Sequence, residues 1–269
     1  MKGKGEAVSE SIGYLIIFSL VLTGIGLITL YGYPLLMQQQ SSANMRNMEQ
    51  TMIVLQNDIK SLTYKLANYR ETSLRVGGGT LSLYGPLYTP QTFKIETDSG
   101  FSFNPPPLGE LRYISTADNT VITLENGAVI EKPLATPGSF MLADPRWYLD
   151  NSASQRTLVI TFMNLSSATT EGQLLSQTGV GTVRMRLSGS RMTSPDWGGS
   201  PTNVRITYSP ANTATITPDG YALAWKTYLT NAVNFPGVTW SSVMGNDVYQ
   251  FANINKIVIK EYDIIVETL

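Results

Sequence analysis

The sequence predicts an α+β protein, with a long N-terminal membrane and stalk helix followed by a mainly antiparallel, jelly-roll-like β-sandwich that carries one short helix. An uncharged apolar run comes first, an amphipathic stripe follows it, and short apolar segments between turn residues fill the remainder. The expected divisions are a leader over residues 1–11, a transmembrane helix over 12–37, a stalk helix over 38–70 and a β-rich domain over 71–269.

Composition limits the function before any motif is considered. The chain carries 19 basic and 20 acidic residues, so we expect no basic surface for nucleic acid. Charged residues make up only 14% of the chain, against about 25% in ordinary soluble domains. Cysteine and histidine are both missing, which excludes Ser-His-Asp triads, thiolate nucleophiles and Cys- or His-ligated metals. We therefore expect no enzyme, no metal and no cofactor.

The apolar run is long enough to cross a membrane. Ile12–Tyr33 alone spans about 30 Å of hydrocarbon as an α-helix, and no residue from Ile12 to Met37 is charged. Tyr31, Tyr33 and Pro34 lie where an aromatic interface belt would end the span, and Pro34 predicts a kink. A buried core helix is the alternative, but such a helix rarely runs this far without a charge. A cleaved secretory signal is disfavoured because no A-x-A-like site follows.

The flanking charges predict the orientation. Lys2 and Lys4 precede the span, and positive residues stay on the cytoplasmic side. We therefore expect a single-pass protein of the cell membrane with a cytoplasmic N-terminus and an extracellular C-terminal domain. Membrane lipid is its first expected partner.

A stripe of apolar residues at alternating spacings of three and four follows the span and predicts an amphipathic helix from Gln38 to about Tyr69. The stripe can pack on the β domain of the same chain or on the stripes of neighbouring subunits. For its C-terminal half we favour the intramolecular contact, since a helix beside a sheet is the common way to bury such a face. The stripe consists of Met45, Met48, Met52, Leu55, Ile59, Leu62 and Leu66.

The sequence after the amphipathic helix predicts about ten short strands and one helix. Asn126-Gly127 between two apolar runs is a strong hairpin signal, and Asn104–Pro107 predicts a loop. Pro218–Asn234 breaks the strand pattern and favours one amphipathic helix. The Gly77–Gly79 run marks the end of the helical region and is a turn, not a phosphate loop. The expected strands are Thr80–Leu83, Phe93–Glu96, Leu111–Ser115, Thr120–Glu125, Ala128–Glu131, Thr157–Asn164, Gly181–Leu187, Thr202–Tyr208, Thr213–Thr217, Asp247–Phe251 and Lys256–Thr268.

Two candidate sites lie in this domain. Asn164-Leu165-Ser166 is an N-glycosylation sequon. The segment around Asp196 and Trp197 is rich in turn residues, so Trp197 is either a binding hot spot or an aromatic plug that anchors the loop. The other three tryptophans are predicted to lie in the core: Trp147, Trp225 and Trp240.

The first ten residues, MKGKGEAVSE, place a Lys/Gly leader and two glutamates before the apolar run. This resembles the class III signal peptide of archaeal type IV pilins and archaellins. The resemblance implies cleavage between Gly5 and Glu6 by a prepilin peptidase-like enzyme. Glu10 would then pair with the N-terminal ammonium of a neighbouring subunit, so that neither charge stays unpaired near the bilayer. The alternative is an uncleaved anchor whose charges are solvated at the headgroups.

Further stretches resemble an uncharacterised family of archaeal pilin-like, single-anchor envelope proteins: Ala7–Pro34, Met45–Ile59, Gly77–Leu83, Ile122–Ile130 and Ile257–Glu267. The resemblance implies a cell-surface protein that takes the pilin export route, with pilin-like self-assembly or contact with other envelope proteins. It names no activity. Because the chain is longer than many major pilins, we expect a minor pilin or an envelope component with a structural or adhesive role. The alternatives are an uncleaved bitopic binding protein for glycan or protein and, last, an extracellular hydrolase that uses carboxylates.

Overall fold

The structure is a computed structural model, which describes the chain in six stretches. Two compact units form, over residues 1–44 and 45–269. The six described stretches are 4–65, 67–88, 92–151, 155–168, 175–209 and 220–269.

The first unit is helical. It contains α1 (Lys4–Leu27), one π-helical turn (Ile28–Gly32) and the start of α2 (Tyr33–Tyr64). The helical run from Ser11 is long and apolar enough to cross a membrane, and none of its most apolar stretch is buried within the chain. It could therefore anchor the protein in a membrane.

The π-helical turn stands directly before Pro34. The backbone N–H of Tyr33 donates to the carbonyl of Ile28, one residue further back than in an α-helix. Because Pro34 has no N–H and its ring crowds the carbonyl four residues earlier, the regular ladder cannot continue through this point. The helix irregularity expected at Pro34 is thus a widened turn just before it.

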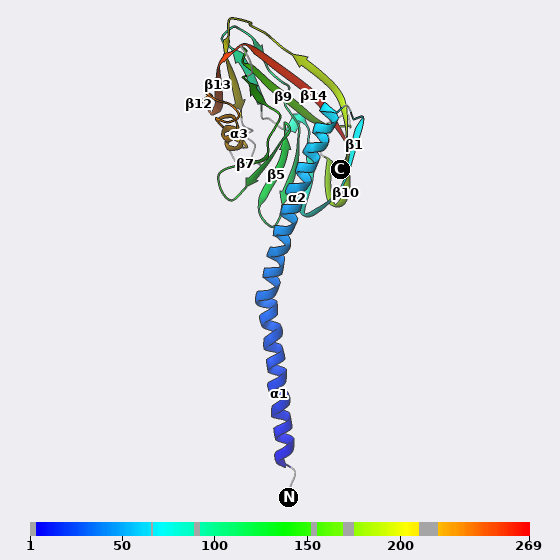
Figure 1. Cartoon of the computed structure of the whole chain (residues 1–269). Coiled ribbons are helices and arrows are strands. Elements are labelled where there is room, and N and C mark those ends of the chain that lie inside the picture. Colours follow the sequence, from blue (N-terminus) through cyan, green and yellow to red (C-terminus); the bar gives the residue numbers. More distant parts are fainter. Residues whose placement is uncertain (1–3, 66, 89–91, 152–154, 169–174, 210–219) are drawn as a thin grey trace. The chain divides into compact units, whose positions relative to one another are not determined.

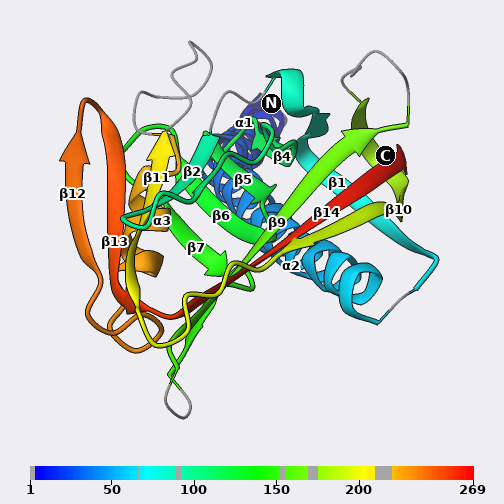
Figure 2. The same ribbon diagram turned by 90° about the horizontal axis from the view of Figure 1, so that it is seen from above.

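The second unit contains two open sheets, seen from above in Figure 2. Among the described strands only β14 and β9 pair in parallel. The nine-stranded sheet has the order β7 (Phe140–Ala143), β6 (Ala128–Pro133), β5 (Thr120–Glu125), β4 (Glu110–Ser115), β1 (Tyr69–Tyr84), β10 (Leu175–Thr193), β14 (Lys256–Thr268), β9 (Thr157–Ser167) and β8 (Tyr148–Asp150). The five-stranded sheet has the order β12 (Thr239–Val243), β13 (Asn246–Ile254), β11 (Thr202–Ser209), β2 (Thr92–Thr97) and β3 (Ser102–Phe103).

The predicted fold class is confirmed: a long apolar N-terminal helix precedes a mainly antiparallel β domain with one short helix, α3 (Ala222–Leu229). The predicted hairpin forms between β5 and β6, where Asn126 and Gly127 both adopt positive φ. The predictions missed β3, β7, β8 and β12. The expected strand Thr213–Thr217 and stripe residue Leu66 lie outside the described residues.

Two predicted boundaries were wrong. The stalk helix ends at Tyr64 rather than near residue 70, and strand β1 begins at Tyr69. The glycine run lies inside β1, where the pairing register shifts between Val76 and Leu81. A Cβ on Gly79 would stand 2.2 Å from the carbonyl oxygen of Ile114, so the bulge needs glycine for this close approach.

One face of the nine-stranded sheet is covered by α2, which lies across it in Figure 1. Side chains of β1, β4, β5, β10 and β14 pack against the apolar stripe of the helix. The intramolecular contact predicted for the C-terminal half of the stripe is therefore confirmed, and it extends to the beginning of the stripe. The buried stripe residues are Met45, Met48, Met52, Leu55, Ile59 and Leu62.

The opposite face packs against the five-stranded sheet and α3 through an aromatic core. Trp147 and Trp225 are buried in it, as predicted. The Trp225 ring lies 5.0 Å from Phe93 and 5.2 Å from Trp147, centroid to centroid. The indole N–H of Trp147 donates to the carbonyl of Thr161, which satisfies that buried donor.

Candidate functional site

The candidate leader and its glutamate lie at the start of α1. Gly5, Glu6 and Glu10 belong to this helix, where the structure describes the backbone and not the side chains. Lys2 lies outside the described residues. Cleavage before Glu6 and the pairing of Glu10 remain predictions.

The sequon residue Asn164 lies within β9, half-buried, with both ends of its amide engaged. Its Oδ1 accepts from the backbone N–H of Gly109 at 3.1 Å, and its Nδ2 donates to Asp263 at 3.3 Å. A glycan on Nδ2 would replace one of its two hydrogens, so the contact with Asp263 would have to use the other. The folded domain therefore presents this amide as a structural link between β9 and β14.

The Trp197 loop is anchored to the domain. The half-buried indole packs against the aromatic core, 6.4 Å from the Phe101 ring, and its backbone N–H donates to Asn255. Asp196 is exposed, and it accepts from the backbone N–H of Gly198 and pairs with Lys256. The hydrogen bond from Gly198 lowers the pKa of Asp196. This geometry is that of an aromatic plug, the second of the two roles considered for Trp197.

The prediction that Trp240 is a core residue was wrong. It lies on β12, the edge strand of the five-stranded sheet, and 39% of its surface remains exposed. The segment from Thr239 to Met244 shows no regular alternation of polar and apolar residues, so the sequence contains no clear sign that Trp240 is exposed.

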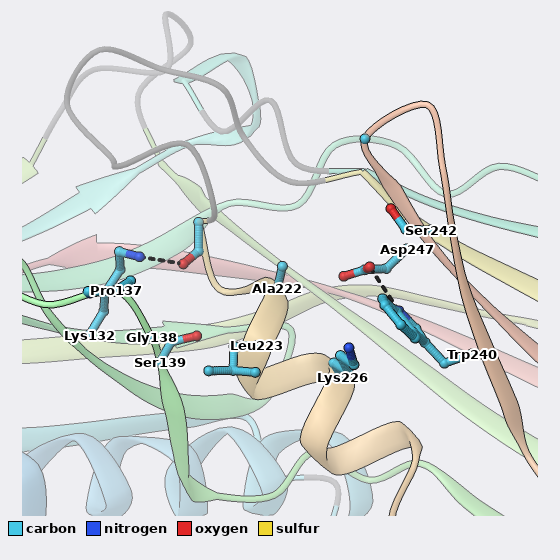
Figure 3. Close-up of a pocket in the computed structure, with 12 residues that line it drawn as sticks. Lys132, Pro137, Gly138, Ser139, Ala222, Leu223, Lys226, Trp240, Ser242 and Asp247 are labelled. Carbon is cyan, nitrogen blue, oxygen red and sulfur yellow. Dashed lines mark hydrogen bonds between the residues drawn. The ribbon is translucent and has the colours of Figure 1, made fainter.

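The exposed Trp240 lines a cavity of about 450 Å³ between α3 and the β12–β13 hairpin, drawn in Figure 3. The Lys226 ammonium nitrogen lies 3.1 Å from the centroid of the Trp240 ring system, a cation–π contact. Asp247 accepts a 2.9 Å hydrogen bond from the indole N–H. The ring is thus held at one face and at its edge by residues of α3 and β13.

The other wall of this cavity is also fixed. The buried Lys132 of β6 donates to the carbonyl of Gly220 at 2.9 Å. The hydroxyl of Ser139 accepts from the backbone N–H of Ala224 at the start of α3. Leu223 adds an exposed apolar side chain beside Ser139 (Figure 3). Sequence reasoning nominated none of these residues.

A second hollow, of about 660 Å³, lies over the five-stranded sheet. Its charged residues are largely engaged with one another or with residues nearby. Lys94 and Glu96 pair at 2.7 Å, and Arg205 binds Asp98.

A buried ionisable cluster lies between the two sheets. Arg112 pairs with Glu110, whose carboxylate also accepts from Thr123. Burial raises the pKa of Glu125 to about 8, and the nearby Arg112 guanidinium lowers it by less. The Trp225 indole lies near that carboxyl, but within the described part of the chain neither oxygen of Glu125 has a hydrogen bond of normal geometry. Glu125 is therefore protonated at neutral pH.

Among the described residues, no three or more acidic side chains lie close enough together to ligate a metal ion.

These features define a class: an α+β protein whose apolar N-terminal helix could anchor a β domain in a membrane. The chain belongs to a family of unknown function (DUF7289), whose family model matches residues 6–235. It matches no curated protein and no solved structure.

Proposed function

We propose that this protein is a pilin-like, membrane-anchored component of the archaeal cell surface, with a structural or adhesive role. One observation carries the proposal. The apolar residues 12–37 are unburied within the chain, while the described part of the stripe that follows them, Met45 to Leu62, packs against the chain's own β domain. An uncharged helix of this length needs lipid or similar helices around it.

This division of the helix defines how copies could associate. Because Met45 to Leu62 are covered by the sheet, they are not available to neighbouring subunits. Self-assembly would then involve the residues before Met45, as in a bundle of apolar helices. The N-terminal lysines favour a cytoplasmic N-terminus, which would place the β domain outside the cell.

The processing step is the first thing to test. Mass spectrometry of the protein from membranes of its source organism should find a chain that begins at Glu6. A chain that keeps Lys2 and Lys4 would refute pilin processing. It would favour the second candidate, an uncleaved bitopic protein that binds a glycan or protein. The cavity at Trp240 supports this candidate.

The role of Glu10 is tested next. If Glu10 pairs with a neighbouring N-terminus, Glu10→Ala should abolish surface filaments while leaving the protein in the membrane. Glu71→Ala, which removes an exposed pair with Arg184, is the matched control and should leave filaments intact. Filaments that survive Glu10→Ala would count against subunit pairing at this position.

The topology needs its own experiment. Protease added to intact cells should degrade the β domain, and a C-terminal tag should be accessible to antibody without permeabilisation. A protected domain would contradict the proposed orientation. Recovery of the chain in the soluble fraction after lysis would contradict membrane anchoring itself.

A further inference from the structure

We propose that the cavity between α3 and the β12–β13 hairpin binds a neutral pyranose sugar, with Trp240 as the stacking platform. This inference rests on the proposed surface function, for which it supplies the ligand class. Nothing in the family match assigns a site to these residues. The cavity volume of about 450 Å³ falls within the range of small-molecule sites.

The first argument is the exposure of Trp240. A tryptophan on an edge strand has ample apolar surface to bury, yet this one keeps 39% of its surface in solvent. Its partner at one ring face is the Lys226 ammonium, and its edge is fixed by Asp247. The ring is therefore preorganised before any ligand arrives, which lowers the entropic cost of binding. The C–H face of a pyranose is an apolar surface of the right shape for the exposed part of the ring.

The second argument is the position of polar groups around the ring. Asp247 uses one carboxylate oxygen for the indole, and its other oxygen can accept from sugar hydroxyls. Ser242 is exposed on the same hairpin and can donate or accept (Figure 3). A planar apolar surface bordered by a carboxylate and a hydroxyl matches the two kinds of surface that a sugar ring presents.

The third argument concerns charge. Lys226 is engaged with the ring, and Lys132 is buried and donates to the Gly220 carbonyl. The Lys226 ammonium is the charge nearest to the ring, and the carboxylate of Asp247 lies at the ring edge beside the indole N–H. A neutral sugar can donate its hydroxyls to this carboxylate without placing a second anion beside it, so the neutral class is favoured.

The cavity is suited to binding and not to cleavage. Asp247 is the one carboxylate among the described residues that line it, whereas glycoside hydrolysis ordinarily uses a pair of carboxylates. The lining side chains also hold one another in place through the contacts given above. The site therefore fits adhesion, with no chemical step.

The test uses the full-length chain in lipid nanodiscs and saturation-transfer NMR. The neutral probes are the methyl pyranosides of glucose, galactose, mannose and N-acetylglucosamine, and glucuronate is the acidic probe. At least one neutral probe should bind with a dissociation constant on the order of millimolar, as expected for a ligand of this size. Glucuronate should bind more weakly than glucose.

Two variants locate the site. Trp240→Ala should weaken binding by at least about tenfold, because it removes the platform. Trp240→Phe should retain part of the affinity, since a smaller ring still stacks. Trp197→Ala is the matched control on the other partly exposed tryptophan, and it should bind as wild type does.

Several outcomes would overturn the inference. The first is that no neutral probe binds the wild-type chain even when the probe is present well above millimolar concentration. The second is that glucuronate binds more tightly than the neutral probes. The third is that binding is lost in Trp197→Ala but not in Trp240→Ala. Flotation of the same nanodisc sample measures membrane insertion independently. A chain that binds sugar but does not float with lipid would refute the anchor and leave the sugar site standing.

Discussion

The two faces of the nine-stranded sheet are buried in different ways. The face toward α2 is closed by Met, Leu and Ile side chains from a single helix. The face toward the five-stranded sheet and α3 is closed by aromatic rings and contains the ionisable groups of Glu110, Arg112 and Glu125. The helical face depends chiefly on apolar burial, whereas the stability of the aromatic face also depends on the protonation state of buried groups.

The largest expected effect on stability comes from a substitution in the helical face. Leu55→Ala should lower the free energy of unfolding by about 2–5 kcal/mol, because it leaves a cavity under a fully buried side chain. Val54→Ala, one residue away on the exposed side of α2, should change it by about 0.5 kcal/mol or less. Chemical denaturation measures both. Equal effects of the two variants would show that α2 is not seated as described.

A smaller effect tests the polar contact on the helical face. The buried Gln56 donates from Nε2 to the carbonyls of Gly127 at 2.7 Å and Asp144 at 2.9 Å. Gln56→Met keeps the side-chain volume but leaves both carbonyls without this donor. The free energy of unfolding should therefore fall by about 1–3 kcal/mol. If thermal unfolding of Gln56→Met matches wild type, this amide is not the link between α2 and the β5–β6 turn.

The third effect belongs to the aromatic face and depends on pH. Glu125 has a pKa of about 8 in the fold, against 4.5 in the unfolded chain. Between these values the folded state keeps a proton that the unfolded state releases, so stability falls as pH rises through this window and levels off above it. Glu125→Gln should reduce the loss of stability between about pH 5 and about pH 8 by up to roughly 3 kcal/mol, since one pKa unit corresponds to about 1.4 kcal/mol.

The pH test is free of histidine, because the chain has none. Glu96→Gln, on an exposed side chain paired with Lys94, is the control and should leave the pH dependence unchanged. An unaltered slope in Glu125→Gln would show that this carboxyl is not the proton-binding group of the aromatic face.

The helical face could be predicted from the sequence because the apolar stripe repeats with helical spacing. The hairpin at Asn126-Gly127 could also be predicted, because both residues tolerate positive φ. On the aromatic face, Trp147 and Trp225 could be predicted as core residues, but the buried ionisable groups could not. Glu125 and Lys132 lie in strands whose neighbours are apolar, and no local pattern shows that the second sheet will cover them.

Trp240 shows the same limit for the candidate site. Its exposure follows from the position of β12 at the edge of a sheet, which depends on pairing with β13 and β11. The contact of Lys226 with Trp240 depends on how α3 packs beside the β12–β13 hairpin. The cavity also includes β6, which is distant from both of these segments in the chain. Such contacts carry no sequence periodicity, so the cavity could not be nominated beforehand.

The position of β14 in the sheet has a consequence for folding during synthesis. This last strand lies between β10 and β9, in the interior of the nine-stranded sheet, and pairs in parallel with a strand made about a hundred residues earlier. The sheet therefore cannot close until β14 has been made. Until then, the apolar side of α2 has no complete surface to cover it. A ribosome that stalls before β14 would leave the facing edges of β10 and β9 unpaired, and unpaired strand edges of this kind can pair with other chains.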